Sequence, residues 1–113
     1  MCLSSLKRFR AGNVGYKLGT IDGETLRTPH ENLELPFDTW VSDKSREILM
    51  TEETGRAYKA GFHIYLSEHD AKESYLHRYG ATLTRCQFAE VVQTGIQYGQ
   101  KVVVARRIKV LKP

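Results

Sequence analysis

The stretch that decides the expected fold covers residues 58–79 and reads YKAGFHIYLSEHDAKESYLHRY. Apolar and polar side chains alternate from Phe62 to Leu66, and this period of two predicts a strand. Ser67 follows at once as a candidate helix N-cap, because its hydroxyl can accept a hydrogen bond from the first helical turn. The acidic residues of that turn suit the positive end of the helix dipole. A strand is therefore expected to lead into a helix with almost no loop between them.

The helix is expected to end at Gly80, a residue type that often follows the last helical turn. We expect the strand to turn three side chains toward the core and the helix to pack three others over the sheet. These are Phe62, Ile64 and Leu66 in the strand and Ala71, Tyr75 and Tyr79 in the helix.

The rest of the chain is dominated by strand patterns. Residues 14–21, 83–92 and 102–111 are alternating or rich in β-branched side chains, so each is predicted to be a strand. An Asp-Gly pair at Gly23 predicts a hairpin turn, with a short return strand at Leu26.

Two segments between these strands lack a clear pattern. Residues 28–36 contain two prolines and are expected to form a loop. Residues 36–55 fit either two short strands or a short helix, with Trp40 as a core anchor or the wall of a groove. The prediction is a single α+β domain over residues 1–113, with a mostly antiparallel sheet of about five strands and one main helix. Residues 1–12 form either one helical turn or a loose basic arm.

The composition is that of an ordinary globular domain. The chain has 113 residues, of which 41% are hydrophobic and 27% charged, and one domain of this size can bury a core. Its two cysteines, Cys2 and Cys86, are too few for a disulfide framework, so we expect reduced thiols, with Cys86 in the core. The first ten residues lack the apolar run of a signal peptide, and no segment reaches transmembrane length. We therefore expect a cytosolic protein without a membrane partner.

Charge is spread unevenly along the chain. The formal net charge is +4, yet residues 20–53 hold nine acids against three bases, and residues 54–113 hold ten bases against four acids. This distribution favours an anionic partner, such as nucleic acid or a phosphate-bearing ligand. The simpler alternative is that the ends and the middle of the chain neutralise each other across the fold.

The last predicted strand carries most of this positive charge. It could grip phosphates through four cations, although a nucleic-acid reader usually adds exposed aromatic side chains, and Tyr98 is the candidate nearby. The alternative is a solvated edge whose charges protect it from aggregation. The four anion or nucleic-acid candidates are Lys101, Arg106, Arg107 and Lys109.

Histidines offer two further hypotheses. His63 could act as a general acid or base, could bond a ligand, or could be a histidine at the core edge satisfied by its neighbours. His69, Glu73 and His77 form one helical stripe that could hold zinc, but the same stripe is expected to face solvent without a fourth ligand. We expect no metal and no cofactor. No nucleophile or phosphate-loop motif is present, so the sequence indicates no catalytic residue.

The order of motifs resembles a family of small proteins of bacteriophages and mobile elements. The shared features are a Tyr-Lys strand at Tyr16, a Gly-Phe-His-Ile-Tyr box followed by a helix over residues 61–71, and a closing Val-Val-Val-Ala-Arg strand over residues 102–106. The resemblance covers most of the chain and implies a cytoplasmic protein of the host cell, without assigned chemistry.

Residues 61–75 also resemble the nicotinamide pocket of the ADP-ribosyltransferase superfamily, which includes tRNA 2′-phosphotransferases. In that family a Gly-Ile-Tyr-Phe strand precedes a helix, and the likeness implies a ring-stacking role for His63 or Tyr65. The chain departs at Tyr16, near the family's Arg or His, and at Gln100, near the family's catalytic Glu. A neutral amide cannot stabilise the positive charge that develops in this chemistry. A shared fold would thus imply a catalytically disabled protein.

These observations lead to two functional hypotheses. The first is a small non-enzymatic binding protein of phage or mobile-element type that docks on a host protein or nucleic acid. The second is an ADP-ribosyltransferase-like module or enzyme that binds a nucleotide. The ligand-binding candidates are His63, Tyr65, Ser67 and Tyr16.

Overall fold

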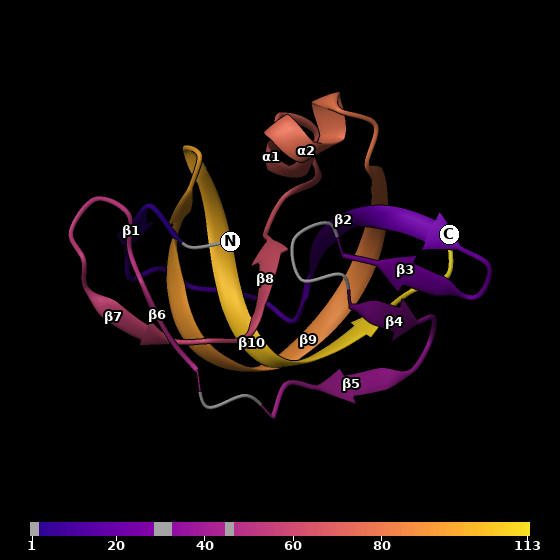
Figure 1. Cartoon of the computed structure of the whole chain (residues 1–113), viewed down its shortest axis with the longest axis horizontal. Helices are drawn as coiled ribbons and strands as arrows, with labels where there is room; N and C mark the ends of the chain where they lie inside the picture. The colour runs from indigo at the N-terminus through magenta and orange to yellow at the C-terminus, as the bar shows by residue number, and fades with distance from the viewer. Residues whose placement is uncertain (1–2, 29–32, 45–46) are drawn as a thin grey trace.

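The computed structural model describes residues 3–28, 33–44 and 47–113, apart from the side chains of residues 75 and 76. The fold is mostly β, so the expected α+β class with about five strands and one main helix is wrong. Eight strands form one sheet with antiparallel pairings, and two more form a separate hairpin (Figure 1). The strands are β1 (Ser5–Leu6), β2 (Val14–Asp22), β3 (Thr25–Arg27), β4 (Glu34–Pro36), β5 (Trp40–Ser42), β6 (Ile48–Met50), β7 (Ala57–Lys59), β8 (Phe62–Tyr65), β9 (Thr82–Gln97) and β10 (Gln100–Val110).

Strands β9 and β10 form a long bent hairpin around which the sheet is built (Figure 1). Strand β10 also pairs with β8, and β2 pairs with both β8 and β9. Each of these four strands is therefore paired with two of the others. The pairing of β9 with β10 shifts register between Val104 and Ala105, and Glu90 of β9 has a positive φ of 59°. An extra residue in one strand bends it and increases its twist, which explains how the hairpin curves over two cores.

The two cores lie on opposite faces of the first half of β10. Val102 and Val104 belong to one cluster, while Val103 and Ala105 belong to the other. All four are 0% exposed, so this half of the strand is buried on both faces. In the second half, Ile108 and Val110 are buried, while Arg107 and Lys109 are partly exposed.

The predicted helix is two short helices, α1 (Glu68–Lys72) and α2 (Tyr75–Arg78). The N-cap prediction is confirmed, because Ser67 Oγ accepts a hydrogen bond of 3.0 Å from the Asp70 N–H. Ser74 interrupts the helical run: it is 1% exposed, and its hydroxyl is 2.9 Å from that of Tyr65. Ala71 is buried as expected, whereas Tyr79 is 80% exposed, so its predicted packing is wrong. The expectation for Tyr75 concerns a side chain outside the described residues.

Strand β8 follows its prediction. Phe62 and Ile64 are buried in one core cluster, and Leu66 packs against the same cluster. Gly61 precedes the strand where the backbone of β10 approaches: an added Cβ would lie 2.7 Å from the Ala105 carbonyl oxygen. This close approach explains why glycine stands there.

The first hairpin also follows its prediction, with Gly23 at φ 64° between β2 and β3. Residues 34–36 were expected in a loop, but they pair with β3 as β4, with Leu35 buried. Residues 40–42 and 48–50 are strands, which resolves the alternative between strands and a helix.

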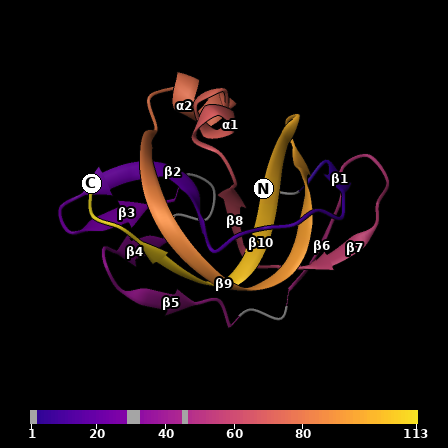
Figure 2. The same ribbon diagram turned by 180° about the vertical axis from the view of Figure 1, so that it is seen from behind.

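The described part of the N-terminal segment lies along β9. Strand β1 pairs with β9, the Ser4 N–H donates to the Ile96 carbonyl at 2.8 Å, and Leu3 is 0% exposed. Figure 2 shows β1 beside the tip of the β9–β10 hairpin. The expectation of a free thiol at Cys2 concerns a residue outside the described ranges. Neither described helix is long and apolar enough to cross a membrane.

Candidate functional site

The four ligand-binding candidates lie together where β8 meets β2 and α1. Tyr16 of β2 is paired directly with Tyr65 of β8, and Ser67 begins the helix that follows β8. His63 lies two residues before Tyr65, so both side chains point to the same face of the strand. We call these four residues the central box.

His63 is held by hydrogen bonds within the fold. Its Nε2 lies 3.4 Å from the Tyr58 hydroxyl, and the rings meet edge to face with centroids 6.1 Å apart. The Tyr58 hydroxyl accepts a hydrogen bond of 2.7 Å from the Leu3 N–H, and Lys17 Nζ donates to the His63 carbonyl at 2.9 Å. Burial, and next the positive charge of Lys17, lower the pKa of His63 from 6.5 to about 3. The imidazole is therefore neutral near pH 7 and poorly suited to proton transfer there.

The other box residues are also engaged in the fold. Tyr65 is 5% exposed, its hydroxyl is paired with that of Ser74, and burial raises its pKa above the usual value. The hydroxyl of Ser67 is used as the helix cap. Tyr16 is half-buried and packs against the core that contains Tyr65. The structure thus brings the four candidates together and gives three of them a structural role.

The four basic candidates do not form one site. Lys101 lies near the hairpin turn, with its ammonium 5.5 Å from the centre of the Phe9 ring. Arg106, Arg107 and Lys109 lie in the second half of β10, toward the opposite end of that strand. Tyr98 lies at the hairpin turn near Lys101, so the expected aromatic partner is far from the other three cations.

The aromatic residue beside these cations is Trp40 of β5. The Arg107 guanidinium lies 5.0 Å from the centre of the indole ring, and Lys109 is paired directly with Trp40 across the two strands. Trp40 is 40% exposed, so the expectation of a core anchor is wrong. Arg106 Nε donates to the Asp43 carbonyl at 2.9 Å, which fixes the segment that follows β5 without neutralising the guanidinium.

Strand register extends this surface across the sheet. Lys109 is paired with Gln87 of β9 as well as with Trp40, and Arg85 lies two residues before Gln87. Directly paired residues share a face, as do alternate residues along one strand. We call Trp40, Arg107, Lys109, Gln87 and Arg85 the basic face. The opposite face of β9 and β10 packs in the core, where Ile108 and Phe88 are buried.

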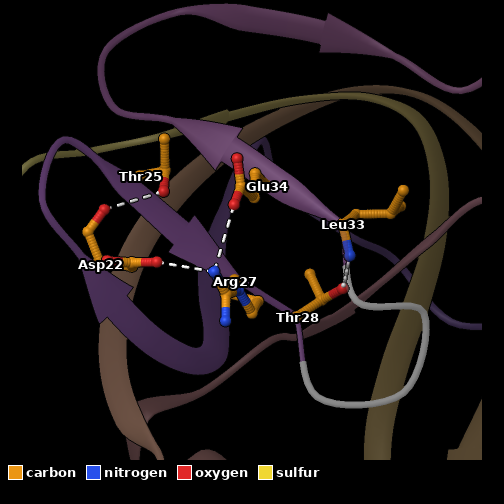
Figure 3. A network of polar contacts seen from close by, with 6 residues as sticks. All are labelled: Asp22, Thr25, Arg27, Thr28, Leu33 and Glu34. Atoms are coloured by element: carbon orange, nitrogen blue, oxygen red, sulfur yellow. Dashed lines mark hydrogen bonds and ion pairs between the residues drawn. The ribbon is translucent and has the colours of Figure 1, made fainter.

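Acidic and basic side chains from different parts of the chain meet in ion pairs. Figure 3 shows Arg27 between Asp22 and Glu34 on the β2–β3–β4 hairpins, at 2.6 and 3.2 Å. Lys112 pairs with Glu24 at 3.4 Å. Part of the charge is thus neutralised across the fold.

The cations of the basic face are different. Within residues 3–28, 33–44 and 47–113, Arg85, Arg107 and Lys109 form no ion pair. Arg85 was missed by sequence reasoning because its place beside Lys109 depends on strand register.

The described structure shows three further features outside the central box and the basic face. No three His, Cys, Asp or Glu side chains among the described residues gather closely enough to hold a metal. Cys86 is buried in the core as expected, and burial raises its pKa to about 12, so the thiol stays protonated. Gln97 Nε2 and Gln100 Oε1 are buried at the base of the hairpin turn without a hydrogen-bond partner in the described part of the chain.

Comparisons with known proteins give no match: no family model, curated protein or solved structure is similar to the chain.

Proposed function

We propose that the chain is a small non-enzymatic binding protein of phage or mobile-element type that docks on a macromolecule of the host through its basic face. The observation that carries the proposal is the pair formed by Arg107 and Trp40, since the indole is 40% exposed while the guanidinium lies over its ring. A tryptophan is a large apolar side chain, and leaving it in water forfeits the free energy of burial. Trp and Arg are also the side chains that most often dominate binding energy at interfaces.

The setting of this pair supports binding as well. Both strands are fixed by pairing, and Arg106 ties the end of β5 to β10. Contact with Trp40 limits the rotamers of Arg107 before any partner arrives. A surface that is ordered in advance loses less conformational entropy on binding.

The central box gives little support to the rival hypothesis of an ADP-ribosyltransferase-like enzyme. His63 is neutral and hydrogen-bonded, and the Tyr65 hydroxyl is paired inside the fold. Gln100 stands near the position where the family has its catalytic Glu. An amide there offers neither a charge nor a base to the reaction.

Two measurements test the proposal. The purified chain, incubated with labelled NAD and candidate acceptors, should transfer no label. The tagged chain should also capture a partner from host extract, and a Trp40→Ser, Arg107→Gln double variant should lose that partner. Tyr79→Ser is the matched control, because it removes an aromatic side chain that is 80% exposed on another part of the surface.

Label transfer that disappears in Tyr65→Ala would overturn the proposal in favour of the enzyme. Equal capture by the wild type and by the double variant would show that the basic face is not the docking surface.

A further inference from the structure

We infer that the partner of the basic face is a single-stranded nucleic acid, with a base stacked on Trp40 and phosphates bound by Arg107, Lys109 and Arg85. This inference rests on the proposed function and names the class of partner. It follows from the charge of the face, the spacing of its cations and the placement of its one aromatic ring.

The charge of the basic face favours a partner with many negative charges. The basic face carries three cations without ion pairs in the described chain, and none of its five members is acidic. Arg106, next to it on β10, donates to a backbone carbonyl and forms no ion pair in the described chain. A partner with regularly repeated negative charge complements such a face, since each phosphate contact releases a bound counterion.

The spacing of the three cations favours a chain of phosphates. Arg107 and Lys109 are alternate residues of one strand, so their Cα atoms are about 6.8 Å apart. Arg85 lies on β9, the neighbouring strand, two residues from the direct partner of Lys109. The three cations thus form a short track across two strands instead of a compact cluster. Successive phosphates of an extended single strand are separated on a similar scale, so a chain of phosphates fits this track better than one isolated anion.

The position of the Trp40 ring favours a single strand. Trp40 lies at the end of the track, directly opposite Lys109, on the outer strand β5. Every nucleobase has a π-face, and stacking on an exposed aromatic side chain binds single strands with little dependence on sequence. In a duplex the bases already stack on each other, so the ring would find no free face. The combination of track and ring therefore favours a single strand over a duplex.

A protein partner fits the face less well. The centres of protein interfaces are depleted in charged residues other than Arg and are enriched in aromatic side chains and Met. Apart from Trp40, the five named residues are cations or an amide, and one exposed apolar residue, Val14, is paired directly with Gln87. The exposed apolar residues Ile48 and Met50 lie on a different sheet, in β6.

Trp40 is the one tryptophan of the chain, so tryptophan fluorescence reports on the basic face directly. Titration with an oligothymidylate of roughly 16 nucleotides, at the upper end of the usual site sizes, should quench the fluorescence of Trp40 at low salt. The affinity should fall as salt rises, with a slope of log K against log salt concentration of about −2 for three phosphate contacts. Heparin serves as a polyanion without bases. It should compete for binding but leave the fluorescence largely unchanged.

Variants are compared by the anisotropy of a labelled oligonucleotide. Lys109→Gln should reduce the salt slope by about 0.7, the share of one phosphate on a single strand. Trp40→Ser should weaken binding by about tenfold with little change in slope, since stacking carries no charge. Lys59→Gln is the control: it removes one exposed cation from β7, outside the basic face, and should change neither quantity.

Three results would overturn the inference: no binding at low salt, binding without quenching of Trp40, or equal losses in Lys109→Gln and Lys59→Gln. Capture of a protein from host extract that Trp40→Ser abolishes, without oligonucleotide binding, would reject the nucleic acid and leave the proposed docking function intact. If neither an oligonucleotide nor a Trp40-dependent partner binds, the docking function fails as well.

Discussion

The central box and the basic face both place polar and aromatic side chains on the same sheet, but they use them in opposite ways. In the box, the His63 ring and the Tyr65 hydroxyl each have a hydrogen-bonding partner within the fold. On the basic face, Arg107 and Lys109 form no ion pair in the described chain, and Trp40 remains 40% exposed. A polar side chain near a strand end is thus no evidence of a site by itself. What distinguishes the regions is whether its hydrogen-bonding and charged groups are already satisfied.

Because the box residues are engaged in the fold, substitutions near them should reduce stability. The largest loss is expected at Ile64, which lies between His63 and Tyr65 and packs in the core. Ile64→Ala should lower the free energy of unfolding by about 2–5 kcal/mol, because Ile64 is 0% exposed and its loss leaves a cavity. Urea denaturation measures the change. Ile48→Ala is the control: Ile48 is 56% exposed, so its effect should stay within about 0.5 kcal/mol. Equal effects of the two variants would contradict the described position of β8.

Acid should expose the structural role of His63. Its pKa is 6.5 in the reference state and about 3 in the folded chain, so the unfolded chain binds the extra proton between these values. The contribution of His63 is therefore fully present above pH 6.5 and is lost as the pH falls toward 3. The loss should amount to roughly 2–4 kcal/mol over that window.

The measurement is the free energy of unfolding at several pH values for the wild type and for His63→Gln, which cannot titrate. The difference between the two curves should slope between pH 6.5 and 3 and be flat above it. A difference that is flat throughout would place His63 in water and reopen the central box as a ligand site.

The hydroxyl of Tyr65 tests the same region more finely. Tyr65→Phe keeps the buried ring but removes the group paired with Ser74, so the free energy of unfolding should fall by about 1–2 kcal/mol. Thermal melting of the wild type and Tyr65→Phe detects this change. No loss of stability in Tyr65→Phe would mean that its hydroxyl is free to serve a ligand.

Sequence patterns predicted the long and regular elements well. Alternating or β-branched patterns located β2, β8, β9 and β10. The short strands were harder, because β4 turns only Leu35 inward and one buried side chain makes no period. The predicted strand ends at residue 92, yet β9 continues through Gly95, where β1 packs so closely that an added Cβ would lie 2.5 Å from the Ser5 carbonyl oxygen.

The sites were harder to predict than the strands. The helical pattern through Tyr79 gave no sign that the Ser74 hydroxyl would pair with Tyr65 and interrupt the helix. The basic residues of β10 were visible, but their neighbours Trp40 and Arg85 come from segments about 70 and 20 residues away in the sequence. Only strand register brings them together, and register depends on long-range pairing that local periodicity does not encode.

The smallest effect on stability is expected on the basic face, and this result would complete the comparison. Trp40→Ser should lower the free energy of unfolding by less than about 1 kcal/mol, because an exposed cation–π contact with Arg107 contributes only roughly 0.5–1 kcal/mol. Arg107→Gln should have a similarly small effect, since Arg107 forms no ion pair in the described chain. Urea denaturation of both variants beside Tyr65→Phe provides the measurement. A loss above about 2 kcal/mol in Trp40→Ser would make the indole part of the core and remove the reason to regard this face as a binding surface.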